Sequence, residues 1–112
     1  MSDESVASLI PAQFDYQLER LVSDIEQKRK DTPKVYVQGV QDFILAVRNT
    51  LNLDDDFLNH DFENVETALN KVAEYCDGDS VGDREALVFA DYVEIKLKHV
   101  IATYDCFKDP AE

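Results

Sequence analysis

The chain has 112 residues, of which 45% are hydrophobic and 31% are charged, and its formal net charge at pH 7 is −13. This length forms one domain with a single core, and this hydrophobic content excludes a globally disordered chain. Three glycines and three prolines are too few for the many tight turns of a β-sandwich or β-barrel, so the composition favours an all-α fold.

The first predicted helix carries one apolar stripe at helical spacing, formed by Phe14, Leu18, Leu21, Val22 and Ile25. Pro11 lies near its expected start. The stripe is followed by the basic triplet Lys28 to Lys30, where the C-terminal end of a helix dipole stabilises positive charge. We interpret this triplet as a helix terminus rather than a nucleic-acid patch.

The second predicted helix begins at Thr32 and Pro33, a pair typical of an N-cap and a first turn. Its apolar positions are Val40, Phe43, Ile44, Val47 and Leu51. The run from Val35 to Val37 favours β-structure and is followed by Gly39, so an extended segment is the alternative there. We favour the helix.

A connector is expected over residues 52–62, which have no clear period, and Asp61 is expected to cap the third helix. The apolar positions of that helix are Phe62, Val65, Leu69, Val72 and Cys76. Gly78 is expected to end it, because glycine adopts the left-handed conformation that follows many helices.

The last predicted helix is long, with Ser80 or Asp83 as its cap and an end near Phe107. One apolar stripe is Ala86, Phe89, Val93, Leu97, Val100 and Tyr104, and a second is Val88, Tyr92, Ile95 and His99. A helix with so wide an apolar arc is central in a bundle or is buried against another chain. We therefore predict an antiparallel bundle of about four helices with this helix at its centre, and frayed ends over residues 1–10 and 108–112.

The glycine- and aspartate-rich turn after Tyr75 does not match a calcium-binding loop. With Asp77 at the first ligand position, Asp79 and Gly82 fit the third and sixth positions, but valines occupy the fifth and twelfth. Too few oxygen ligands remain, so we predict no metal at this acidic turn.

The sequence does not indicate catalysis or a cofactor. His60 lies among aspartates that favour its protonated form and is expected at the surface, whereas His99 is expected to be packed and hydrogen-bonded. No serine or cysteine is spaced to suggest a triad with either histidine, and three glycines cannot form the common phosphate-binding loops. We therefore predict a protein that is not an enzyme.

Cys76 and Cys106 are isolated cysteines, without the pairing of a zinc or redox motif. The prediction is two reduced, partly buried thiols; a disulfide would need their Cα atoms within about 6 Å. The acidic N-terminus differs from a signal peptide, and no apolar run is long enough to span a membrane, so a cytoplasmic protein is expected.

The negative charge is concentrated in the second half: residues 1–51 carry eight acids and six bases, whereas residues 52–112 carry sixteen acids and five bases. Such a surface repels nucleic acid and anionic membranes and attracts basic proteins. The candidate partner-binding acids are Asp54, Asp55, Asp56, Asp61, Glu63, Glu66, Glu74, Asp77, Asp79 and Asp83. Phe57, Phe62 and Tyr75 are the candidate aromatic anchors.

Two hypotheses of function follow from these patterns. The first is a non-enzymatic acidic protein that occupies a basic surface of a partner, such as a nucleic-acid-binding protein, as inhibitors, DNA mimics and immunity proteins do. The second is a structural subunit that forms a homodimer through the stripe Val88, Tyr92, Ile95 and His99. Acidity that serves only solubility is the simplest alternative to the first.

Overall fold

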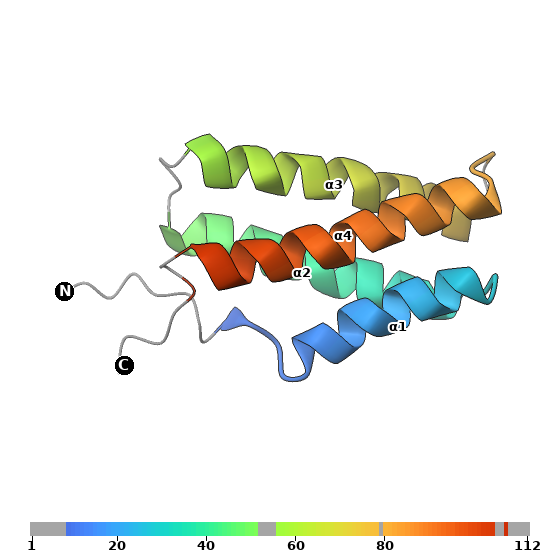
Figure 1. Cartoon of the computed structure of the whole chain (residues 1–112), viewed down its shortest axis with the longest axis horizontal. Helices are drawn as coiled ribbons and strands as arrows, with labels where there is room; N and C mark the ends of the chain where they lie inside the picture. Colours follow the sequence, from blue (N-terminus) through green and yellow to red (C-terminus); the bar gives the residue numbers. More distant parts are fainter. Residues whose placement is uncertain (1–8, 52–55, 79, 105–106, 108–112) are drawn as a thin grey trace.

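The chain is seen in a computed structural model that describes residues 9–51, 56–78, 80–104 and 107 (Figure 1). These residues form four α-helices and no strand: α1 (Phe14–Glu26), α2 (Thr32–Leu51), α3 (Asp56–Cys76) and α4 (Asp83–Thr103). The predicted all-α bundle of four helices is confirmed.

Successive helices run in opposite directions and pack in a ring, with α1 next to α2 and α4, and α3 next to α2 and α4 (Figure 1). Each helix therefore occupies one corner of the bundle. The prediction that the last helix is central is wrong, and α4, with 21 residues, has the same length as α3. Because α4 packs mainly on two neighbours, part of its wide apolar arc remains uncovered.

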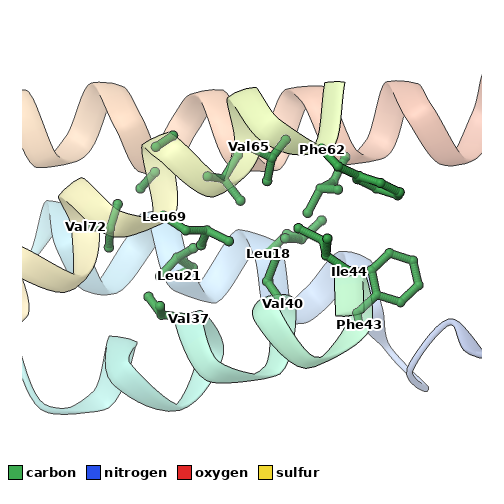
Figure 2. Close-up of a cluster of buried hydrophobic side chains, with 14 of the residues drawn as sticks. Leu18, Leu21, Val37, Val40, Phe43, Ile44, Phe62, Val65, Leu69 and Val72 are labelled. Atoms are coloured by element: carbon green, nitrogen blue, oxygen red, sulfur yellow. The ribbon is translucent and has the colours of Figure 1, made fainter. Parts of the chain in front are cut away.

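The core is formed by the apolar stripes of all four helices, and Figure 2 shows side chains of α1, α2 and α3 pointing towards one another. Fully buried members include Leu18, Leu21, Ile44, Phe62, Val65, Leu69, Val93 and Leu97. The rings of Phe14 and Phe43 pack at 5.0 Å between centroids and join α1 to α2. Burial of these side chains is the main stabilising contribution to the fold.

The turn after α1 closes with two backbone hydrogen bonds typical of a Schellman motif. The amide of Lys28 donates to the carbonyl of Ile25 at 2.9 Å, and the amide of Arg29 donates to the carbonyl of Asp24 at 2.8 Å. Lys28 adopts a φ of 62°, the left-handed conformation that glycine usually supplies at this position.

The basic triplet contacts its own bundle, in agreement with its interpretation as a helix terminus. Lys28 lies 3.7 Å from Asp83, Arg29 lies 3.2 Å from Asp24, and Lys30 lies over the ring of Tyr75. The second helix begins near the predicted start, but Thr32 is its first helical residue rather than its N-cap. Residues 35–37 are helical, so the extended alternative is wrong.

The third helix begins at Asp56, so the predicted connector is wrong over residues 56–62 and Asp61 does not cap the helix. The physical reason is Leu58, which is buried and extends the stripe of Phe62 by one turn. Residues 52–55 lie outside the described residues. Gly78, with a φ of 87°, follows the end of α3 as predicted.

The last helix differs from the prediction at both ends. Its N-cap is Gly82 in an extended conformation, so neither Ser80 nor Asp83 caps it. The helix ends at Thr103, and Phe107 lies beyond it with its ring buried and its centroid 6.1 Å from that of Phe43.

Residues 9–10 are half-buried and pack against the core. Residues 1–8 and 108–112 lie outside the described residues. None of the described helices has the length and apolar character needed to cross a membrane.

Candidate binding surface on α3 and α4

Four of the predicted partner-binding acids contact other helices of the same bundle: Asp61, Glu66, Asp83 and, in a more exposed pair with Lys34, Asp77. Asp61 lies 3.2 Å from Lys96 on α4 and accepts a hydrogen bond from the Tyr104 hydroxyl at 3.1 Å. Glu66 forms a 2.8 Å ion pair with Arg48 on α2. The charges of Asp61 and Glu66 are largely matched inside the bundle, so these two acids add little to an attractive field for a partner.

Asp83 is the third of these acids. Its carboxylate accepts a 2.7 Å hydrogen bond from the hydroxyl of Tyr75, whose ring is buried. Burial of the ring and this hydrogen bond raise the pKa of Tyr75 to about 12. The same hydrogen bond, with the nearby Lys28 charge, lowers the pKa of Asp83 below its usual value.

Asp77 and two further predicted acids lie at the surface in pairs that are mostly exposed. Asp77 lies 3.2 Å from Lys34, and Glu74 lies 3.7 Å from Lys71. Glu63 lies 4.0 Å from Nδ1 of His60, which is at the surface as predicted. Exposed ion pairs contribute at most about 1 kcal/mol, so a partner can compete for these carboxylates.

Several of the predicted partner-binding acids, and one of the two cysteines, lie outside the part of the chain whose side chains the structure describes. Asp54, Asp55, Asp79 and Cys106 lie outside the described residues, and Asp56 is described only as the first residue of α3. Glu85 and Asp91 belong to the same acidic second half of the chain; both are exposed on α4, and neither is paired with a base in the described part of the chain.

Two of the three predicted aromatic anchors are inaccessible. Phe62 is 0% exposed and Tyr75 is 1% exposed, so neither ring is available to a partner, and the prediction is wrong for both. Both face the core because they continue the apolar stripe of α3. Phe57, at the start of α3, is 80% exposed.

The second stripe of α4 faces outward. Val88, Tyr92 and Ile95 are 66%, 37% and 61% exposed. His99 at the end of the stripe is also exposed, so the expectation that it is packed is wrong. These four residues share one face because they are separated by three or four positions along the helix.

A shallow groove adjoins this stripe between α3 and α4. It has a volume of about 270 Å³. Its lining residues are Asn64, Thr67 and Ala68 on α3 and Val88, Phe89 and Tyr92 on α4. The sequence did not identify the α3 residues as part of a groove because they are small or polar. Asn64 lies three residues before Thr67 and four before Ala68, and this spacing is the only signal that they share one face of the helix.

A buried ionic cluster on α1 was also missed. Asp24 is 0% exposed, and one of its carboxylate oxygens lies 3.2 Å from both Arg20 and Arg29. The spacing of Arg20 and Asp24, four residues apart, is the signal that could have indicated it. Both arginines come from α1 or the turn after it, so the cluster joins the last turns of the helix to that turn.

The described residues contain no group of three or more histidine, cysteine or acidic side chains that could hold a metal ion. Cys76 is a free thiol buried on α3, and its burial raises its pKa. No protein-family model matches the sequence, and neither a curated protein nor a solved structure shows significant similarity to the chain.

Proposed function

We propose that the protein is a non-enzymatic binding protein that occupies a basic surface of a partner protein with the face formed by α3 and α4. The observation that carries this proposal is the exposed apolar stripe Val88, Tyr92 and Ile95 beside the α3/α4 groove, on a chain whose net charge is −13. Contiguous exposed apolar side chains are typical of interaction sites.

The apolar and acidic features have separate physical roles. Acidic charge accelerates the encounter with a basic partner and makes the association dependent on salt. Affinity comes mainly from a few apolar or aromatic side chains that are buried on binding, and Tyr92 is the aromatic member of the stripe. Both features are found on α4, where Glu85 and Asp91 lie within one turn of Val88.

The experiment is affinity capture from host lysate at low and high salt, followed by identification of the captured protein by mass. It compares the wild type with Tyr92→Glu and with Leu45→Glu. Leu45 is a matched control because it is an apolar side chain, 59% exposed, on α2. The captured protein is then purified and its dissociation constant is measured for all three variants.

We expect the captured protein to be basic, to bind the wild type and Leu45→Glu, and not to bind Tyr92→Glu. Its binding should weaken as the salt concentration rises. Capture that is equal for all three variants, or unchanged between low and high salt, contradicts the proposal. Circular dichroism of each variant establishes that the fold is retained.

Self-association through the same stripe is the second candidate function, and the exposure of Val88, Tyr92 and Ile95 is the observation that favours it. Sedimentation over a range of concentrations would then detect a dimer that Tyr92→Glu dissociates. A monomer at every concentration contradicts this candidate. Repulsion between two copies, each with a net charge of −13, opposes it at low salt.

A further inference from the structure

We infer that the groove between α3 and α4 binds an amphipathic helix of the partner, with lysine or arginine flanking the apolar stripe of that helix. This inference rests on the proposed function and names the element of the partner that the surface would recognise. Docking of a helix into an apolar groove is a common mode of protein recognition.

The apolar side chains exposed on α4 are arranged along one line of the helix. Val88, Tyr92 and Ile95 are exposed at positions i, i+4 and i+7, which extend over about 10 Å of a helix that rises 1.5 Å per residue. This is the ridge that packs between the side chains of a second helix. A partner helix of about three turns is sufficient to cover it.

The side of the groove formed by α3 has room for a neighbouring helix. Asn64, Thr67 and Ala68 line it from α3, and their short side chains leave space for a neighbouring backbone. Packed helices in proteins lie 8–10 Å apart, roughly, and the smaller separations need small residues at the contact. The groove is shallow and open, with a volume of about 270 Å³, so side chains of a docked helix can enter it.

The side chains around the groove carry more negative than positive charge. The helix α3 contains five acids and one lysine, and α4 contains four acids and three bases. Glu85 and Asp91 are exposed beside the stripe, and Glu63 lies one turn from Thr67, whose hydroxyl donates to its carbonyl at 3.0 Å. Among nearby bases, Lys71 is already paired with Glu74, and Arg84 is exposed one turn before Val88. Glu63, Glu85 and Asp91 still outnumber the one described base of this rim that is not in an ion pair. Basic residues flanking the partner's stripe complement this rim.

A second copy of the chain fits this surface less well than a basic helix. Each copy carries a net charge of −13, so two copies repel each other. The apolar stripe covers about two helical turns, whereas a stable interface usually involves about 20–30 residues on each side. The small apolar area and the acidic rim both favour a short basic segment.

The test is selection of binders from a display library of random peptides long enough to form five helical turns. The library is selected on the wild type and counter-selected on Ile95→Lys. Ile95 is 61% exposed, so this change leaves the core intact while it removes an apolar contact and repels a basic peptide. Leu45→Lys on α2 is the matched control for the added charge.

The inference expects selected peptides with apolar residues at helical spacing and lysine or arginine beside them. They bind Leu45→Lys like the wild type and Ile95→Lys at least about tenfold more weakly, and neutral substitution of their basic residues weakens binding by about tenfold at low salt. Absence of selected peptides, peptides without helical spacing, or peptides that bind Ile95→Lys unchanged overturns it.

The results of the lysate capture, the sedimentation and the peptide selection together distinguish failure of this inference from failure of the proposed function. A captured partner that requires Tyr92 but binds through a non-helical segment overturns the helix and leaves the proposed function intact. A dimer in sedimentation that Tyr92→Glu dissociates, together with no selected peptide, overturns both in favour of a second copy. A lack of any partner or peptide that depends on the stripe contradicts both.

Discussion

Replacing Tyr75 by phenylalanine removes one hydroxyl from the contact between the end of α3 and the start of α4. The hydroxyl donates a 2.7 Å hydrogen bond to Asp83, while the ring itself is buried and would keep its packing. The variant therefore tests the hydrogen bond with little change in core volume.

The expected loss follows from the exposure of Asp83. A hydrogen bond to a charged group contributes roughly 1.5–3 kcal/mol. The Asp83 side chain is 51% exposed, so water replaces the lost donor and the loss falls at or just below the lower limit of this range, about 1–1.5 kcal/mol. For a domain of this size, that corresponds to a melting temperature lower by about 4–8 °C.

The difference in the free energy of unfolding between the wild type and Tyr75→Phe also depends on pH. Because the pKa of Tyr75 is raised from 10.0 to about 12 in the folded protein, its contribution is complete below pH 10 and is lost as pH rises towards 12. Because the pKa of Asp83 is lowered from 3.8, its contribution is complete above that value and is lost as pH falls through the lowered pKa. The difference is therefore largest near neutral pH.

The assay is urea unfolding of both proteins across this pH range, with tyrosinate absorbance as a second readout. Tyr16→Phe is the matched control, because Tyr16 is 55% exposed and forms no hydrogen bond with another described residue through its hydroxyl. The reasoning is refuted if the two variants are equally stable at neutral pH, to within about 0.5 kcal/mol.

Three further changes test local features of the fold by urea unfolding or labelling. Lys28 has a φ of 62°, so Lys28→Gly relieves backbone strain and is expected to stabilise the protein by about 1 kcal/mol. Lys28→Ala, which like Lys28→Gly loses the Asp83 contact, keeps the strain and gives no gain. Equal stability of the two variants would contradict the strain. Leu97→Ala removes a fully buried side chain and should cost about 2–5 kcal/mol, against less than about 0.5 kcal/mol for the exposed Val88→Ala; similar losses would place Leu97 outside the core. Cys76 is buried with a raised pKa, so mass spectrometry should detect its alkylation only after unfolding, and rapid alkylation of the folded protein would disagree.

The acidic side chains serve two different roles in this bundle. Asp61 and Glu66 bind bases on neighbouring helices at 3.2 and 2.8 Å, and their charge is matched within the fold. Glu85 and Asp91 are exposed on α4 beside the apolar stripe. Glu85 and Asp91 therefore contribute to the field that a partner meets at the α3/α4 groove, whereas Asp61 and Glu66 contribute little.

The sequence by itself determined that the chain forms four helices, and where several of them begin or end. This was predictable because side chains three and four residues apart lie on one helix face, so a helix is encoded within a few turns of sequence. The stripe from Phe14 to Ile25 lies in α1, and its members Phe14, Leu18, Leu21 and Ile25 are buried in the core. Thr32 begins α2 and Gly78 follows α3, as their local conformational preferences indicated.

Only the tertiary structure decided which apolar and acidic side chains remain accessible. Phe62 looked like a surface anchor among acids but is fully buried, and α4 has two apolar stripes of which only one faces its neighbours. The groove joins Ala68 to Tyr92, which are far apart in sequence. The physical reason is that the pattern of a single helix fixes which residues share a face, whereas the rotation and packing of its neighbours fix which face is covered.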